Sequence, residues 1–92
     1  MTAPDLQREA TIVNPLGLHA RPAAQFVRLA NSFASDILVS KDGLDVNGKS
    51  IMGVMMLAAE CGSAIRIRAT GDDAEQAVEA LAKLVADGFG ES

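Results

Sequence analysis

The chain has 92 residues and a net charge of −4, so it fits one small domain with one core, and a nucleic-acid binder, which is usually basic, is not expected. A single cysteine and a single histidine exclude an internal disulfide and leave no plausible zinc cluster, so neither a metal nor a cofactor is expected. The longest apolar stretch, around 51–59, is too short to span a bilayer, and we expect a cytoplasmic protein without membrane insertion.

The first third of the chain predicts a strand, a turn and a helix. Residues 6–13 alternate loosely and end in a β-branched pair, which is typical of a strand. Residues 1–5 precede it and are expected to be a loose N-terminal end. Turn-forming residues occupy 14–17, and an amphipathic helix is predicted over 20–33, where apolar side chains recur at spacings of three and four.

The middle of the chain predicts a hairpin and a short helix. Two short β-prone runs, 36–40 and 43–47, are separated by Lys41-Asp42-Gly43. An Asp-Gly pair between strands is a strong hairpin signal. A second helix is predicted over 50–59, a segment that is almost entirely apolar.

The last third predicts one more strand and one more helix. Residues 64–70 alternate strictly between apolar and polar side chains, and the final helix is expected to begin at an Asp72-Asp73 cap and to end at Gly88. The resulting order is β-α-β-β-α-β-α. It predicts an α+β fold in which three helices cover one face of a four-stranded, mostly antiparallel sheet.

His19 is the only histidine, and it stands between the turn and the first helix. Pro22 falls in the first turn of that helix, where its missing N–H costs nothing, so His19 is expected near the N-cap. Unpaired N–H groups at such a terminus bind anions, and Arg21 adds a cationic donor. No second titratable group is close to His19 in sequence. The alternative is an ordinary surface histidine.

These residue types suit a phosphohistidine. Imidazole is nucleophilic near neutral pH, and covalent catalysis through histidine is an established route. A phosphoryl group on the ring of His19 would gain about 0.3–1 kcal/mol from the helix dipole and about 1.5–3 kcal/mol from each charge-assisted hydrogen bond. This is enough to hold the group without burying it.

Two segments resemble the motifs of a known family. Gly17-Leu18-His19-Ala20-Arg21-Pro22-Ala23 is similar to the active-site motif of HPr, the histidine-containing phosphocarrier of the bacterial phosphotransferase system, and Asn47-Gly48-Lys49-Ser50-Ile51-Met52-Gly53-Val54-Met55 resembles its second motif. The similarity runs from about Leu6 to Gly90. It implies a single HPr-like domain over 1–92 and the fold of an open-faced β-sandwich.

The resemblance also implies a role for each motif residue. His19 would accept a phosphoryl group from enzyme I, on the ring nitrogen nearer the backbone, with the assistance of Arg21. The protein would then donate the group to a downstream enzyme II A-type component and would act as a carrier, not as an enzyme. Whether the acceptor belongs to the sugar-transport or the nitrogen-related branch is left open by the sequence.

The apolar helix over 50–59 is expected to have two different faces. If Val54, Leu57 and Ala58 face the core, other apolar side chains must face outward, and an exposed apolar surface favours docking. The alternative is a helix that is buried all round. The resemblance favours docking, with partner contacts expected at Ala20, Ala24, Arg28, Ile51, Met52 and Met55.

Ser50 is expected to be the N-cap of this helix, worth about 1 kcal/mol. The resemblance adds a regulatory role, because in many family members the serine of this motif is phosphorylated by a dedicated ATP-dependent kinase, HPr kinase/phosphorylase. The charge would stand at the edge of the docking surface.

Residues 43–50 also match the phosphate-loop pattern G-x-x-x-x-G-K-[ST]. A nucleotide hydrolase is nevertheless disfavoured, because the chain is too short for the usual parallel sheet. The interior of the motif alternates like a strand, and Asp45 would place a negative charge beside the nucleotide. A third hypothesis, a regulatory binding module without phosphotransfer, is disfavoured by the presence of His19 and Arg21.

Overall fold

The computed structural model describes residues 4–91. Its strands are β1 (Asp5–Thr11), β2 (Asp36–Lys41), β3 (Leu44–Asn47) and β4 (Ala64–Thr70). Its helices are α1 (Ala20–Asn31), α2 (Ile51–Met56) and α3 (Ala74–Ala86), followed by a 3-10 turn, η1 (Gly88–Gly90). The predicted order of elements is confirmed.

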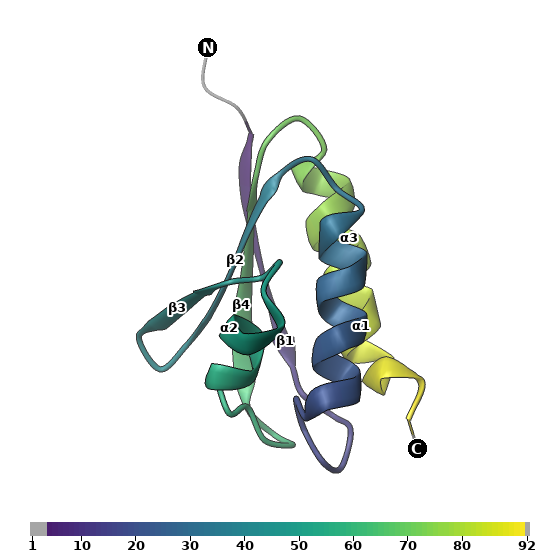
Figure 1. Cartoon of the computed structure of the whole chain (residues 1–92). Helices are drawn as coiled ribbons and strands as arrows, with labels where there is room; N and C mark the ends of the chain where they lie inside the picture. Colours follow the sequence, from purple (N-terminus) through teal and green to yellow (C-terminus); the bar gives the residue numbers. More distant parts are fainter. Residues whose placement is uncertain (1–3, 92) are drawn as a thin grey trace.

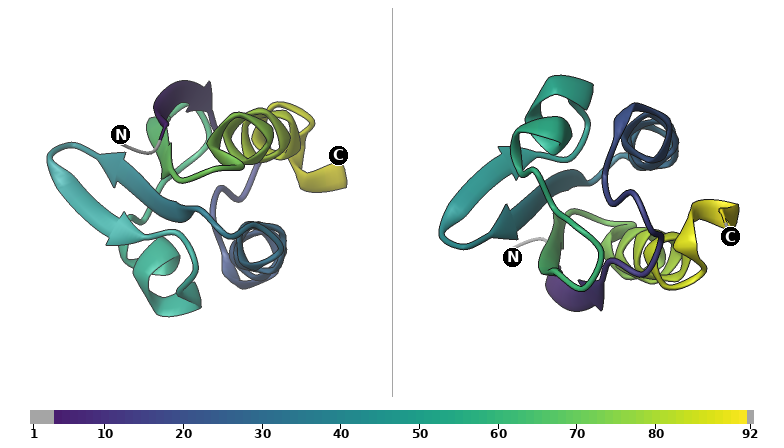
Figure 2. Two further views of the ribbon diagram at one scale, coloured as in Figure 1. Left: turned by 90° about the horizontal axis from the view of Figure 1, so that it is seen from above. Right: turned by 90° about the horizontal axis from the view of Figure 1, so that it is seen from below.

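The four strands form one sheet in the order β1-β4-β2-β3, and every neighbouring pair is antiparallel. All three helices lie on the same side of this curved sheet (Figures 1 and 2). The other face carries no helix. The predicted α+β open-faced β-sandwich is therefore confirmed, with a sheet that is fully antiparallel.

Alternation along β4, one of the two inner strands, explains how the sheet acquires one buried face. In β4, Ile65 and Ile67 are buried against the helices, whereas Arg66 and Arg68 are exposed on the open face. The helices supply the opposite half of the core with apolar stripes, including Phe26, Val27, Val78, Leu81 and Val85. The core therefore lies between the sheet and α1 and α3.

The predicted hairpin between β2 and β3 is present and turns at its Asp-Gly pair, whereas Lys41, expected between the strands, is the last residue of β2. Asp42 and Gly43 both have positive φ, 51° and 85°, as a type I′ turn requires. The register pairs Lys41 with Leu44 on either side of the turn.

The N-terminal prediction needs a correction. Asp5, expected in the loose end, is the first residue of β1 and pairs with Thr70. Its carboxylate accepts hydrogen bonds from the Arg68 guanidinium, which lowers the pKa of Asp5. Of the rest of that predicted end, the carbonyl of Pro4 accepts a hydrogen bond from the Gly71 N–H at 2.9 Å, and residues 1–3 lie outside the described residues.

The second helix is shorter than predicted. α2 ends at Met56, and Ala58 has a positive φ of 48°. This left-handed residue breaks the helical periodicity, so Ala58 is exposed and Ala59 is buried in its place. The expectation that Ala58 faces the core is wrong, whereas Val54 and Leu57 are buried as predicted.

The start of α3 uses its aspartate differently from a simple cap. Asp73 occupies the N-cap position but makes no capping bond within its own helix. Its carboxylate instead accepts hydrogen bonds from the backbone N–H groups of Ala34 and Ser35, both at 2.9 Å, and from the Ser35 hydroxyl. These bonds, the one from the Ser35 hydroxyl first, lower the pKa of Asp73. Asp73 therefore ties the start of α3 to the loop before β2.

We expect Asp73→Asn to lower the melting temperature at pH 7, because the amide replaces a carboxylate that accepts three bonds. The folded pKa of Asp73 is below its unfolded value of about 3.9, so the stabilisation is complete above that value and is lost as pH falls through the folded pKa. Melting curves from pH 7 to 2 should show the two proteins converging. Asp72→Asn, at the exposed neighbouring residue, is the control. A difference that stays constant with pH would contradict the assignment.

Candidate functional site

A tight turn after β1 sets the position of His19. The Gly17 N–H donates to the Asn14 carbonyl at 3.1 Å, and Pro15 stands in the second position of the turn. Gly17 has a φ of 67°, and a Cβ there would lie 2.3 Å from the Ala59 carbonyl oxygen. Only glycine fits this place. The predicted turn is thus present and brings the chain against the loop that follows α2.

The next two residues carry the chain into α1. Leu18 is buried, and its N–H donates to the Ala59 carbonyl at 2.9 Å. His19 is extended and is the N-cap of α1, with its own carbonyl accepting from the Ala23 N–H at 3.0 Å. The predicted position of His19 is confirmed. Since Pro22 has no N–H, only Ala20 and Arg21 offer first-turn N–H groups to an anion.

The structure brings a carboxylate to His19 from the other end of the chain. The Nε2 atom of His19 lies 3.1 Å and 3.2 Å from the two carboxylate oxygens of Glu91. Glu91 follows η1, and 72 residues separate it from His19. No pattern in the sequence connects the two residues, so the sequence does not identify Glu91 as the partner of His19. His19 does have a titratable neighbour, although none is close to it in sequence.

This contact fixes the roles of the two ring nitrogens. An ionised carboxylate only accepts hydrogen bonds, so Nε2 of His19 carries a proton and Nδ1 has the free lone pair of the neutral ring. The hydrogen bond from His19 is the main cause that lowers the pKa of Glu91, and further contributions come from Asn14 and from the charges of His19 and Arg21. The His19 side chain is 35% exposed, so its ring remains open to a partner.

Asn14 supports this arrangement by bonding to both the turn and Glu91. Its side chain is buried, and its Nδ2 group donates to the Gly17 carbonyl at 2.7 Å and to Glu91 at 3.0 Å. Both neighbours are acceptors, so the amide must point its N–H groups at them. Its Oδ1 atom has no partner among the described residues, a deficit of about 1–3 kcal/mol. From the sequence, Asn14 is recognisable only as a turn residue.

Arg21 is exposed at the start of α1. Among residues 4–91, no side chain or carbonyl forms a hydrogen bond or an ion pair with its guanidinium. It lines a shallow cleft of about 400 Å³ together with Pro15, Leu16, Gly90 and Glu91. The cleft therefore holds an uncommitted cation together with Glu91, the residue that contacts the His19 ring.

Ser50 and the helix after it match most of their predictions. The Ser50 hydroxyl accepts from the Gly53 N–H at 3.1 Å, which confirms the N-cap. The exposed apolar side chains of α2, here named the methionine surface, are Ile51, Met52, Met55 and Met56, with Met52 75% exposed. A helix buried all round is therefore excluded. Met56 was not predicted to be part of this surface, because the resembled motif ends at Met55.

The α1 residues expected at the docking surface lie beside the site. Ala20 and Arg28 are exposed, and Ala24 is half-buried. Helix α1 packs between α2 and α3 (Figure 2), so one side of it adjoins the methionine surface. His19 at the start of α1 and the methionine surface on α2 thus lie on two helices that pack against each other.

The phosphate-loop match does not form a phosphate loop. Leu44–Asn47 is strand β3, as predicted, and Gly48 packs closely on Ile37. The Lys49 ammonium donates to the Phe33 carbonyl at 2.8 Å, just beyond the end of α1. The lysine of the motif therefore bonds to the backbone, and this arrangement disfavours a nucleotide-binding site.

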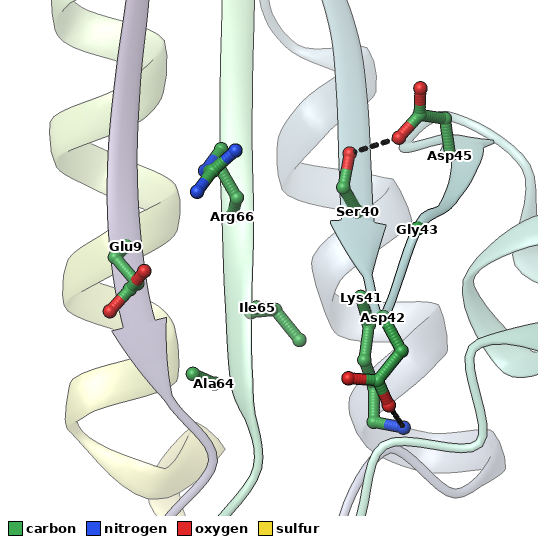
Figure 3. A pocket seen from close by; sticks show the side chains of 9 residues that line it. All are labelled: Glu9, Ser40, Lys41, Asp42, Gly43, Asp45, Ala64, Ile65 and Arg66. Carbon is green, nitrogen blue, oxygen red and sulfur yellow. Dashed lines mark hydrogen bonds and ion pairs between the residues drawn. The ribbon is translucent and has the colours of Figure 1, made fainter.

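A second hollow lies on the open face of the sheet, away from the helices (Figure 3). Its charged side chains have both signs: Arg66 stands between Glu9 and Asp45, and Asp45 accepts a hydrogen bond from Ser40. This mixture favours no single ligand charge. Across residues 4–91, no group of three or more His, Cys, Asp or Glu side chains could hold a metal ion, and no helix is long and apolar enough to cross a membrane.

Comparison with known proteins gives a family model and several relatives that match most of the chain. Residues 6–87 match the family model described as PTS HPr component phosphorylation site. A phosphocarrier protein HPr of Cupriavidus necator is 50% identical over 86 residues, which cover 94% of this chain and 97% of that protein.

Two solved structures agree in fold as well. A phosphocarrier protein HPr from Bacillus anthracis has a TM-score of 0.85 at 52% identity, over 88% of this chain and 96% of that one. The HPr-C-His structure from Thermoanaerobacter tengcongensis has a TM-score of 0.91 at 47% identity, over 95% and 98%. With a histidine at the N-cap of α1 and these similarities over nearly its whole length, the chain belongs to the HPr family, the phosphocarrier proteins of the phosphotransferase system.

Proposed function

We propose that His19 accepts a phosphoryl group on Nδ1 from phosphorylated enzyme I and donates it to an enzyme II A-type component in the cytoplasm. The observation that carries this proposal is the His19 ring itself. Its Nε2 atom is held by Glu91, and its Nδ1 atom makes no hydrogen bond to residues 4–91. A half-exposed nucleophile that is oriented but not buried suits a carrier.

The transfer step follows from this geometry. The Nδ1 lone pair of His19 attacks phosphorus, the bond from phosphorus to the donor atom breaks, and its electron pair stays with the donor. The ring then carries a positive charge shared with Nε2–H, which faces the Glu91 carboxylate. Donation to the next component reverses the step, and the neutral ring leaves as phosphorus bonds to the acceptor.

The bound phosphoryl group would lie at the start of α1. The N–H groups of Ala20 and Arg21 and the helix dipole favour its negative charge there. The uncommitted guanidinium of Arg21 can add charge-assisted hydrogen bonds. All of these donors are exposed, so the group is stabilised without being enclosed and can leave again.

Docking would place a partner's reactive group at His19. The methionine surface offers adaptable thioether side chains, and Ala20, Ala24 and Arg28 extend the contact along α1. An apolar centre with one cation at its side is a common interface composition.

We expect His19→Ala to accept no phosphate when the protein is incubated with phosphoenolpyruvate and enzyme I, because it lacks the only imidazole. In the parent protein, mass spectrometry should locate an acid-labile, base-stable phosphate on His19.

Arg21→Ala should be phosphorylated more slowly at an unchanged melting temperature, and Arg21→Lys should be intermediate.

A normal phosphorylation rate in His19→Ala would refute the proposal. A parent protein that binds enzyme I but takes up no phosphate would favour the regulatory binding module instead.

We expect Met55→Glu to raise the KM of enzyme I for this protein about tenfold and to leave the fold intact, because a charge must be desolvated in the interface. The control is Leu38→Glu. Leu38 is 39% exposed, close to the 42% of Met55, but lies on the open face of the sheet. Steady-state kinetics and melting curves measure both effects. An equal loss in the two variants would argue against docking at α2.

We further propose that Ser50 is a regulatory site for a kinase of the HPr kinase/phosphorylase type. Its hydroxyl is already oriented toward the start of α2, so an added phosphate, of about −1.5 to −2 charges, would face the N-terminal end of that helix. The fold can accommodate it. The charge would nevertheless border Ile51 and the rest of the methionine surface, where it opposes docking.

Ser50→Asp tests this idea, since aspartate is also a good N-cap and adds a charge. We expect a melting temperature close to that of the parent and a much slower transfer from enzyme I. Ser50→Ala separates the two roles: it should lose about 1 kcal/mol of stability with the cap and keep its transfer rate. If Ser50→Asp were phosphorylated at the parent rate, Ser50 would be a cap only.

A further inference from the structure

The buried amide of Asn14 bridges two segments of the site. It is 1% exposed, and its two amide protons go to the Gly17 carbonyl at 2.7 Å and to Glu91 at 3.0 Å. An aliphatic side chain would fill this place without leaving an unpartnered buried oxygen. What Asn14 provides is therefore specific: two donors that hold two different segments together.

The two segments are those that set the His19 ring. Gly17 belongs to the turn that leads into His19, and Glu91 is the carboxylate at Nε2. The same Glu91 oxygen, Oε1, accepts from Asn14 and lies 3.2 Å from Nε2 of His19. A carboxylate after the last turn of a chain has many accessible rotamers, and the bond from Asn14 restricts them.

We propose that Asn14 is a positioning residue for phosphoryl transfer, which acts through Glu91 and directs phosphorylation to Nδ1 of His19. With Glu91 in place, Nε2 is protonated and shielded, so Nδ1 is the nucleophile. Without Asn14, the carboxylate leaves Nε2 for part of the time, and both ring nitrogens become reactive. This inference rests on the proposed function and adds a residue that selects the ring position.

Phosphoramidate tests the selection without any partner protein. It is a small phosphoryl donor: its P–N bond breaks, a P–N bond to the ring forms, and ammonia leaves with a proton from solvent. The position of the phosphate is read by phosphorus NMR. The parent protein should carry it on Nδ1, whereas Asn14→Ala and Glu91→Ala should both give a mixture with Nε2. The double variant should be no less selective than Glu91→Ala alone.

The matched control is Asn31→Ala. Asn31 also donates twice to acceptors, the Val27 and Lys49 carbonyls, but it lies at the far end of α1. It should keep the Nδ1 selectivity. Should Asn14→Ala fold poorly, Asn14→Leu retains the branched shape, lacks both donors and should show the same loss.

Enzyme I supplies a second readout. Asn14→Ala should lower kcat about tenfold and leave KM unchanged, because orientation is lost and the docking surface is intact. Three results would each overturn the inference. The first is selectivity for Nδ1 that is retained in Asn14→Ala, and the second is a double variant that is less selective than Glu91→Ala alone. The third is a raised KM at full kcat in Asn14→Ala. Should enzyme I fail to phosphorylate even the parent, the phosphoramidate result still decides on Asn14, so the two proposals fail separately.

Discussion

The backbone contact between Gly17-Leu18 and Ala59 is the constraint on which the site depends. The Leu18 N–H donates to the Ala59 carbonyl at 2.9 Å, and the Gly17 Cα approaches so closely that no side chain fits there. One partner in this contact leads into His19, and the other follows α2. His19 and the methionine surface are therefore held at a fixed distance by main-chain atoms.

The site has the physical character of a relay and not of a pocket. His19 is 35% exposed, and the cleft beside it is shallow. In this proposal, the energy of transfer resides in the donor's bond to phosphorus, and the chain contributes orientation and a complementary charge. A deeper site would hold the phosphoryl group more tightly and slow its departure.

Local patterns in the sequence predict most of the fold. The strict alternation in β4, the Asp42-Gly43 turn and the apolar stripe of α1 each specify their element within a few residues. Two of the failures have non-local causes: Asp5 is ordered by Arg68 from β4, and Asp73 bonds to the backbone at Ala34 and Ser35. The third, at Ala58, follows from a left-handed backbone conformation that ends α2 early. In the site, His19, Arg21 and Ser50 lie in contiguous motifs, whereas Glu91 and the buried role of Asn14 exist only after folding.

The bridge from Asn14 and His19 to Glu91 also has a kinetic meaning. It joins residues that are 77 and 72 positions apart, the largest separations of any side-chain hydrogen bond among residues 4–91, so forming it closes a long loop. Contacts of such separation form after local ones have reduced the search, and their closure depends on α3 having packed against the sheet. A partly folded chain would display the imidazole without its carboxylate. The His19 ring is therefore oriented only when folding is complete.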